Sequence, residues 1–270
     1  MDNKKILYIS QEISPYMPET AMAKLARNLP QSIQELGDEV RIFMPRYGLI
    51  NERRNQLHEV IRLSGLNLII DDTDHPLIIK VASITQARIQ VYFVDNDDFF
   101  KRKSKFSGKE GMFKDNDERS IFFIRGSLEA IKQLRWIPDV VHCTGAFSAL
   151  TAIYLKKMYH DDPCFSKAKV VYSIYDEPRP VELPETLFKK LAFDKITEDM
   201  VKVMDGKTDA NALHHLACEY ADGIIQGSET LNDELAEIKN SYVGKKPVLD
   251  YQDGDPAEAY RKFYDEVLEK

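Results

Sequence analysis

The chain has 270 residues, of which 43% are hydrophobic, and a formal net charge of -7 at pH 7. This length and composition predict a globular protein with a substantial core, and the acidic balance disfavours nucleic acid or an anionic membrane as the main partner. No apolar stretch near the start is long enough for a signal peptide or a membrane span, which favours a cytoplasmic protein. The cysteines Cys143, Cys164 and Cys218 are too few and too widely spaced to indicate a disulfide framework or a metal cluster, and we interpret them as reduced core thiols.

Strands and helices are predicted to alternate along most of the chain, a pattern typical of α/β proteins with a parallel sheet. Apolar runs predict strands at residues 5–10, 39–44, 139–143, 169–174 and 223–226. Helical spacing of apolar residues predicts one helix ending near Gly37 and others at residues 118–134, 148–158, 208–220 and 230–239. The expected architecture is a doubly wound, mainly parallel sheet covered by helices.

Three segments depart from this alternation. Four β-rich runs with short polar turns, at residues 59–63, 66–70, 77–83 and 88–94, predict an antiparallel, hairpin-type insertion. The polar, lysine-rich stretch 101–117 predicts a mobile loop. Three prolines in residues 176–184 exclude a helix or an inner strand and predict a loop at the carboxyl-terminal edge of the sheet.

The end of the chain has a different composition. We expect residues 1–240 to form the α/β domain, residues 241–255 to be a linker, and residues 256–270, PAEAYRKFYDEVLEK, to form a helix. Apolar residues four apart give this helix an apolar stripe. It is therefore expected to pack back on the domain.

The loop between the first strand and the first helix is the most informative part of the sequence. In doubly wound folds this turn normally holds a phosphate. Residues 12–48, EISPYMPETAMAKLARNLPQSIQELGDEVRIFMPRYG, resemble the start of bacterial glycogen synthases and plant starch synthases, the ADP-glucose-dependent glucan glycosyltransferases. Those enzymes carry Lys-Thr-Gly-Gly-Leu in this loop. This chain has Pro18 at the Lys position, Glu19 at the Thr position, and Thr20 and Ala21 at the two Gly positions.

These four replacements remove the features that would bind a diphosphate. Pro18 supplies neither a cation nor an amide donor, and Glu19 places a negative charge where an anion would dock. Thr20 and Ala21 add bulk where the diphosphate would approach the backbone most closely. We interpret residues 18–21 as a vestigial phosphate loop in which Glu19 and Thr20 cap the helix, as acidic and hydroxyl residues commonly do at a first turn.

The resemblance extends to segments that line the acceptor side of the cleft in that family. PDVVHCTGAFSAL at residues 138–150 is similar to the family's Pro-Asp-Val-Val-His-x-His-Asp-Trp-His, with His142 matching the first His and Phe147 replacing the last. FVDNDDFFKR at residues 93–102 and DNDERSIFF at residues 115–123 also match family segments. The resemblance implies a vestigial acceptor cleft, without a catalytic residue, that contains Asp95, Asn96, His142, Phe147, Tyr175, Asp176 and Asn211. Glu177 and Arg179 are further candidates for a repurposed cleft.

The resemblance also implies a Rossmann-like fold, the N-terminal half of a GT-B glycosyltransferase with a β-hairpin insertion and a C-terminal crossover helix. We expect the nucleotide-sugar-binding half of that family to be missing and only its closing helix to be kept. Our first hypothesis is a non-catalytic protein that binds an α-glucan, a protein partner or a second copy of itself through the face left by the missing half. The alternative is an ADP-glucose-dependent α-1,4-glucan glycosyltransferase completed by a partner chain. No cofactor, metal, nucleic acid or membrane is expected.

Two other clusters favour structural interpretations. His214, His215, Cys218 and Glu219 share one predicted helix, and the spacing of His215 and Cys218 is compatible with a metal. No second pair with zinc spacing accompanies them, so surface or core histidines are favoured over a metal site. The acidic turn at residues 71–75 is similarly interpreted as solvated and not as a cation site.

Overall fold

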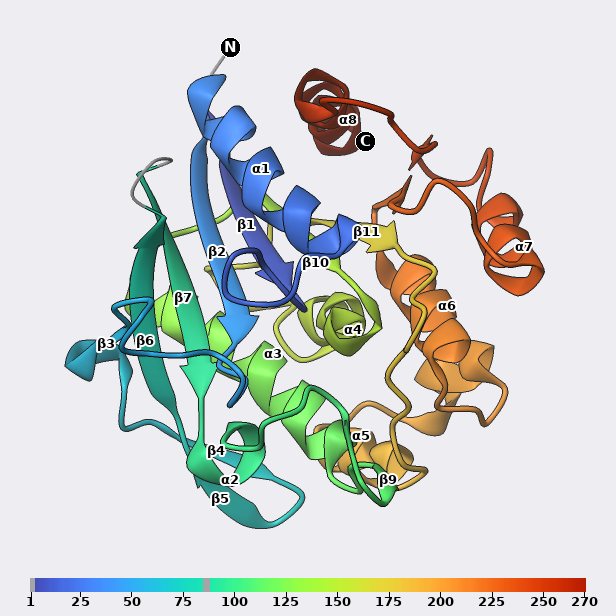
Figure 1. Ribbon diagram of the computed structural model, residues 1–270. Helices are drawn as coiled ribbons and strands as arrows, with labels where there is room; N and C mark the ends of the chain where they lie inside the picture. Colours follow the sequence, from blue (N-terminus) through green and yellow to red (C-terminus); the bar gives the residue numbers. More distant parts are fainter. Residues whose placement is uncertain (1–2, 85–87) are drawn as a thin grey trace.

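The computed structural model describes residues 3–84 and 88–270. Its main feature is a nine-stranded sheet with the strand order β13-β12-β11-β10-β1-β2-β7-β6-β3 (Figure 1). Neighbouring strands are parallel across the sheet from β13 at one edge as far as β7. The next strand, β6, is antiparallel to both of its neighbours, β7 and β3. The expected α/β fold with a mainly parallel sheet is confirmed. The strands are β1 (Lys5–Ser10), β2 (Glu39–Pro45), β3 (His58–Glu59), β6 (Ile78–Ile84), β7 (Ile89–Asp95), β10 (Val140–Thr144), β11 (Lys169–Ile174), β12 (Gly223–Gln226) and β13 (Val248–Leu249).

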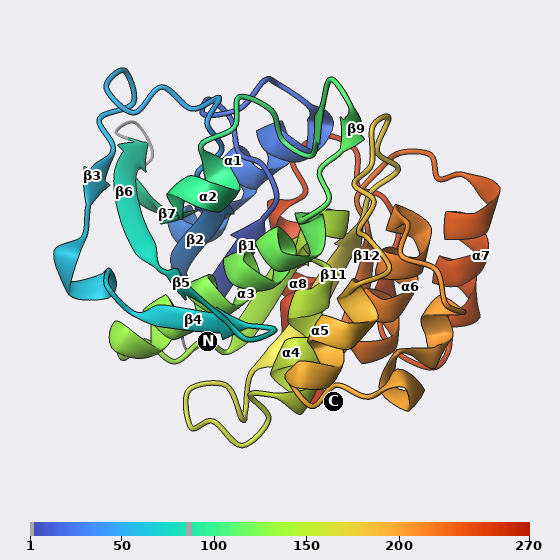
Figure 2. The ribbon, with the colours of Figure 1, turned by 90° about the horizontal axis from the view of Figure 1, so that it is seen from below.

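Helices cover both faces of the sheet (Figures 1 and 2). One face carries α1 (Ala21–Glu35) and α8 (Ala257–Glu269), which contact each other, and the other carries α3 (Asn116–Gln133) and α4 (Leu150–Lys157). The remaining helices are α2 (Asp97–Phe100), α5 (Leu187–Phe193), α6 (Ala210–Tyr220) and α7 (Asp233–Ser241). Within residues 3–84 and 88–270, no helix combines the length and the apolar content that a membrane crossing needs.

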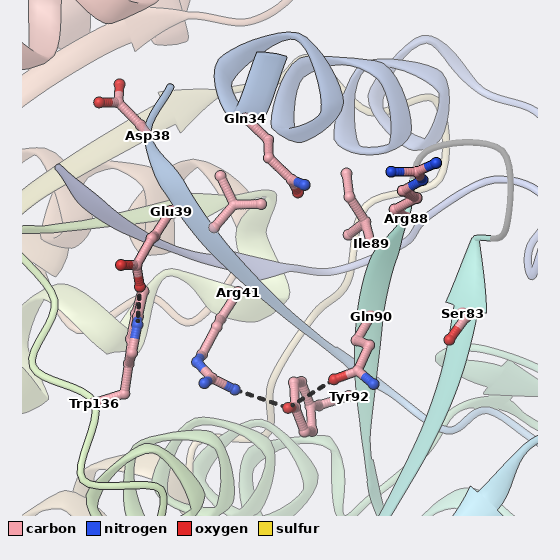
Figure 3. A pocket seen from close by; sticks show the side chains of 11 residues that line it. Gln34, Asp38, Glu39, Arg41, Ser83, Arg88, Ile89, Gln90, Tyr92 and Trp136 are labelled. Atoms are coloured by element: carbon pink, nitrogen blue, oxygen red, sulfur yellow. Dashed lines mark hydrogen bonds between the residues drawn. The ribbon is translucent and has the colours of Figure 1, made fainter. Parts of the chain in front are cut away.

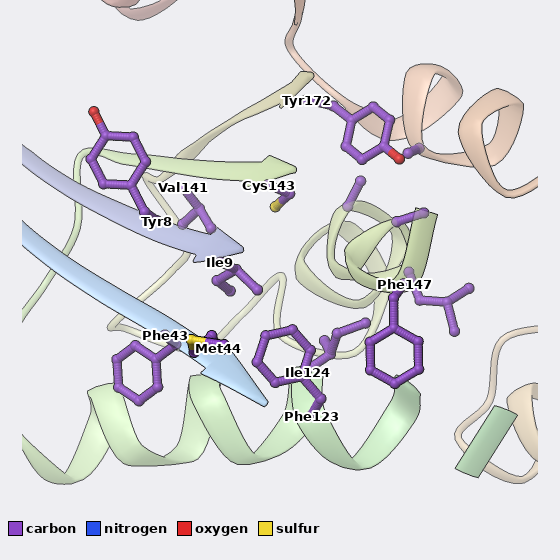
Figure 4. Close-up of a cluster of buried hydrophobic side chains, with 14 of the residues drawn as sticks. Tyr8, Ile9, Phe43, Met44, Phe123, Ile124, Val141, Cys143, Phe147 and Tyr172 are labelled. Carbon is purple, nitrogen blue, oxygen red and sulfur yellow. The ribbon is translucent and has the colours of Figure 1, made fainter. Parts of the chain in front are cut away.

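The central strands are buried on both faces, which explains why their sequences are almost continuously apolar. Ile6, Leu7 and Ile9 in β1 are fully buried. Figure 4 shows Ile9 in the core near Phe123 of α3. The predicted strands 5–10 and 169–174 therefore coincide with β1 and β11.

The insertion between β2 and β7 is antiparallel, as expected. β6 pairs with β7, and β4 (Asn67–Ile70) pairs with β5 (Thr73–Pro76) in a separate hairpin. The predicted strand 59–63 is wrong in part, because β3 ends at Glu59 and a 3-10 turn occupies Ile61–Leu63. In the acidic turn of this hairpin, Asp71 accepts a hydrogen bond from the side chain of Lys189.

Three segments are more ordered than their composition indicates. The stretch 101–117 contains a short hairpin, β8 (Ser107–Gly108) with β9 (Gly111–Met112), and buries Phe106. Between residues 184 and 208 the chain forms α5 and a 3-10 helix, Glu198–Met204, neither of which was predicted. Residues 241–255 include β13, and Lys246 Nζ donates to three backbone carbonyl oxygens at the end of α6.

Helix α8 packs against the face of the sheet formed by β11 and β12 and against α1. Phe263, Tyr264 and Val267 on α8 are buried. A Cβ atom on Gly223 of β12 would lie 2.5 Å from Val267 Cγ2, so this close approach requires glycine. The apolar stripe of the last helix is therefore part of the core.

Candidate functional site

A cavity of about 570 Å³ lies at the carboxyl ends of the parallel strands, among the loops that follow β1, β11 and β12. In the sheet, β1 leads to β2 on one side and pairs with β10 on the other, so the direction of winding changes there. Open α/β sheets bind ligands at this edge, beside such a switch point. The cavity is lined by Glu12, Met17, Pro18, Thr20, Ala21, Met22, Leu49, Lys105, Tyr175, Asp176, Glu177, Pro178, Arg179 and Ser228.

The first loop is closed by hydrogen bonds of its own. Thr20 is the N-cap of α1, because its Oγ1 accepts a hydrogen bond from Ala23 N at 3.0 Å. The Thr20 hydroxyl also donates to Glu12. Glu19 is exposed and lies 3.8 Å from Lys24 Nζ. The capping interpretation is therefore correct for Thr20 and wrong for Glu19.

Glu12 brings a buried carboxylate into the cavity wall. It accepts hydrogen bonds from Thr20 Oγ1 and from Lys105 Nζ, which comes from the segment 101–117. The ammonium of Lys105 is thus already paired with a carboxylate of the chain. A phosphate entering here would have to compete with Glu12 for this cation.

The backbone amides that follow β10 are bonded to side chains of the protein itself. Gly145 has φ +85°, and a Cβ atom there would lie 2.7 Å from Gln11 Oε1, so only glycine fits. Gln11 Oε1 accepts a hydrogen bond from Phe147 N at 2.9 Å, and Glu177 Oε1 accepts one from Ala146 N at 3.1 Å. Gln11 Nε2 donates to the second oxygen of Glu177. In such folds free amides at a helix start commonly bind an anion, and here Glu177 takes that role.

The loop after β11 supplies the opposite wall. Burial raises the pKa of the Glu177 carboxyl, and the hydrogen bonds from Ala146 and Gln11 oppose that shift. Tyr175 is buried against Gly227, whose added Cβ would lie 2.5 Å from the tyrosine ring. Asp176 is exposed and accepts a hydrogen bond from Asn232 N at 2.8 Å. This loop therefore supplies two carboxyl groups to the cavity, one at the exposed Asp176 and one at the less exposed Glu177.

His142 lies beneath α8 and does not line the cavity. Its Nδ1 is 2.8 Å from Tyr264 Oη and its Nε2 is 2.7 Å from Ser173 Oγ. Tyr264 Oη is also 3.2 Å from Tyr8 Oη. Burial lowers the pKa of His142 to about 3, so the imidazole is neutral at pH 7. It links the last helix to the central strands.

Stability is expected to fall as the pH is lowered from 7 to 5, because His142 must stay neutral in the folded state. Its folded pKa of about 3 lies below its ordinary value of 6.5, so only the unfolded chain binds this proton. The stabilisation is complete above the unfolded pKa, and about 2 kcal/mol is lost by pH 5. Urea unfolding at both pH values gives the free energy of unfolding. This free energy should depend less on pH in His142→Leu than in the native protein, whereas the exposed His58→Leu should show the same pH dependence as the native protein. Equal pH dependence in all three would contradict this role.

The other predicted cleft residues have structural contacts away from the cavity. Asp95 is buried 2.9 Å from both Arg46 Nε and Lys80 Nζ. Asn96 caps α2, and Asn211 donates to Glu234 at 2.6 Å. Phe147 is buried beside Phe106. It also stacks on Phe123 (Figure 4). Of the predicted acceptor set, the cavity lining contains only Tyr175 and Asp176 among the described residues.

The remaining histidine and cysteine residues of the sequence clusters also have packing roles. His214 Nδ1 is 2.8 Å from the hydroxyl of Tyr172, and burial lowers the pKa of His214 to about 4. Cys143 and Cys218 are buried and free, as interpreted, whereas Cys164 is only half-buried.

Comparison with known proteins identifies the family. The family model described as the starch synthase catalytic domain matches residues 5–250. The chain belongs to the starch synthase catalytic domain family. It is 34% identical over 267 residues to a glycogen synthase of Chlorobium limicola, covering 94% of this chain and 55% of the relative. It is 38% identical over 190 residues to a glycogen synthase of Chlorobaculum tepidum, covering 70% of this chain and 39% of the relative. The chain thus spans about half the length of such curated relatives.

A solved structure confirms the fold of this chain. The catalytic domain of starch synthase IV from Arabidopsis thaliana, bound to ADP and acarbose, matches with a TM-score of 0.73 and 14% sequence identity. The match covers 96% of this chain and 53% of that one. The resemblance read from the sequence is therefore confirmed for the N-terminal half of the GT-B fold.

Three residues at the cavity and its base were not among the predicted site residues. Gln11, Glu12 and Lys105 hold the loops together, yet none was a candidate. Gln11 and Glu12 directly follow the first strand, at the edge where such folds bind ligands, and that position was the available signal. Lys105 lies 93 positions from Glu12, so only the folded chain shows this pair.

Proposed function

We propose that this chain is a non-catalytic member of the starch synthase catalytic domain family whose cavity binds an α-glucan and not ADP-glucose. The observation that carries the proposal is the occupation of the Ala146 and Phe147 amides by Glu177 and Gln11. These amides are not available to a phosphate. The lining also has three carboxyl groups, Glu12, Asp176 and Glu177, against the two cations Lys105 and Arg179, and this excess of acidic groups disfavours a diphosphate.

The same cavity suits a neutral, hydroxyl-rich ligand. Carboxylates such as Asp176 accept strong hydrogen bonds from hydroxyl groups, and Arg179 at the exposed rim can donate to them. Met17, Met22 and Leu49 provide apolar contact for the carbon-bound faces of a sugar ring. Chemical complementarity thus favours a glucan over a nucleotide sugar.

Calorimetric titration with maltoheptaose, ADP and ADP-glucose tests the proposal. We expect saturable binding of maltoheptaose and none of the two nucleotides. Arg179→Ala should weaken glucan binding by about tenfold, or ~1.4 kcal/mol, whereas the exposed Arg53→Ala should not. ADP binding would favour the alternative, a glycosyltransferase completed by a partner chain. Binding of no probe would instead favour a module that recognises a protein.

Restoring Lys-Thr-Gly-Gly-Leu at residues 18–22 is expected to leave the chain unable to transfer glucose from ADP-glucose. The substituted loop regains a cation and two glycines, but Gln11 and Glu177 still occupy the neighbouring amides. Release of ADP in the presence of maltoheptaose measures transfer, with the Chlorobium limicola glycogen synthase as the positive control. ADP release above background by the substituted chain alone would refute the proposal of a non-catalytic domain.

A further inference from the structure

A second cavity, of about 550 Å³, lies at the opposite end of the sheet, at the amino-terminal ends of β2 and β7 (Figure 3). It is separated from the proposed glucan cavity by the length of the strands, and the two share no lining residue. Arg41 of β2 projects into it between Trp136 and Tyr92 (Figure 3). No feature of the proposed function uses this cavity.

The guanidinium of Arg41 is held in place but is not paired with an anion. Nη1 donates to Tyr92 Oη at 2.8 Å, and Tyr92 Oη donates to Gln90 Oε1 at 3.2 Å. The guanidinium carbon lies 5.3 Å from the centre of the Trp136 ring and 5.8 Å from that of Tyr92. Nε is buried without a hydrogen-bond partner, and among the described residues no carboxylate forms an ion pair with Arg41.

Two carboxylates also line the cavity, and both have partners. Glu39 accepts a hydrogen bond from Trp136 Nε1 at 3.0 Å. Asp38 is buried and accepts hydrogen bonds at 3.0 Å from the backbone N of Lys4 and from Arg261 Nε. Both acidic groups therefore have hydrogen-bond donors other than Arg41.

Arg41 is a half-buried cation that forms no ion pair among the described residues, in a protein with a net charge of -7. Removing a guanidinium from water costs free energy that cation–π contacts repay only in part. The exposed Arg88 adds a second cation at the rim of the cavity. An anionic ligand would supply the missing ion-pair partner of Arg41. The planar guanidinium donors of Arg41 suit a phosphate or a carboxylate.

We propose that this cavity binds a small molecule that carries a phosphate or carboxylate group, with Arg41 as the anion-binding residue and Trp136 and Tyr92 as its aromatic walls. The volume admits a ligand of metabolite size. The site is independent of the proposed glucan cavity, so either proposal can fail without the other.

Trp136 is the only tryptophan in the chain, so its fluorescence reports directly on this cavity. The native protein would be titrated at constant ionic strength with sodium phosphate, sodium citrate and adenosine monophosphate, with sodium chloride as the reference. Isothermal calorimetry with the same probes would detect binding that leaves the fluorescence unchanged. We expect saturable binding of at least one probe and none of chloride. Saturation by citrate alone would identify a carboxylate ligand, and saturation by the two phosphates alone would identify a phosphate ligand.

The variants decide whether Arg41 is the anion-binding residue. Arg41→Gln should weaken binding at least about tenfold, as expected for loss of a charge-assisted contact, and the exposed Arg62→Gln should leave it unchanged. Arg41→Lys keeps the positive charge but loses the planar set of guanidinium donors, so it should retain part of the affinity. This variant replaces Arg41→Gln if Arg41→Gln does not fold. Absence of saturation by every probe in both measurements, or native affinity in the Arg41 variants, would overturn the proposal and leave Arg41 with a packing role only.

Discussion

Alanine in place of Phe263 on α8 is expected to lower the free energy of unfolding by about 3–5 kcal/mol. The phenyl ring is 4% exposed and lies in the layer between α8 and the sheet. The space cannot close by a simple shift of the helix, because α8 is already in tight contact with Gly223 and is tied to His142 through Tyr264. The loss of apolar burial therefore adds to the loss of contacts around a cavity.

Urea unfolding of the native protein and the variant measures this effect. Lys262→Ala on the exposed face of the same helix is the matched control and should change stability by less than about 0.5 kcal/mol. A change of under about 1 kcal/mol for Phe263→Ala would show that α8 is a detachable tail. A loss of about 3–5 kcal/mol would instead show that the last helix unfolds cooperatively with the rest of the domain.

The sequence predicted the fold best where burial is complete on both faces of the sheet. β1 and β11 coincide with their predicted ranges because a fully buried parallel strand needs an apolar residue at nearly every position. The helix α5 was missed because LFKKLAF follows a proline-rich loop and spans only seven residues. The start of α4 was predicted two residues early because Ala146–Ser148 forms a 3-10 turn, bent by Gly145 with its positive φ.

The candidate site was predicted in part, for a physical reason. Pro18, Thr20 and Ala21 line the cavity because the loop after the first strand of such a fold must lie at the carboxyl-terminal edge. The contact of Gln11 with Glu177 joins positions 166 apart, and no local pattern encodes it. Motif matching also cannot separate ligand contacts from packing contacts, so His142, which fastens α8, was grouped with the cleft.

Alanine in place of Arg119 is expected to destabilise the protein by about 3 kcal/mol or more, because it leaves buried acceptors without donors. The guanidinium is completely buried and donates to Phe99 O at 2.8 Å, Lys105 O at 2.7 Å and Asn116 Oδ1 at 2.6 Å. Burial lowers the pKa of Arg119 to about 10, so the group still carries its charge at pH 7. It fixes the segment 101–117 that brings Lys105 to Glu12.

Arg119→Met separates hydrogen bonding from packing, because methionine fills much of the same volume and donates no hydrogen bond. It should be less damaging than Arg119→Ala, whereas Lys109→Ala, on the exposed part of the same segment, should have no effect. Urea unfolding gives the stabilities, and hydrogen exchange should show faster exchange of the amides in residues 101–117 for both Arg119 variants. Native exchange rates there would mean that the segment holds its place without Arg119. If exchange rises as expected, the position of Lys105 at the cavity depends on a residue that touches no ligand, and Arg119→Met should also weaken maltoheptaose binding.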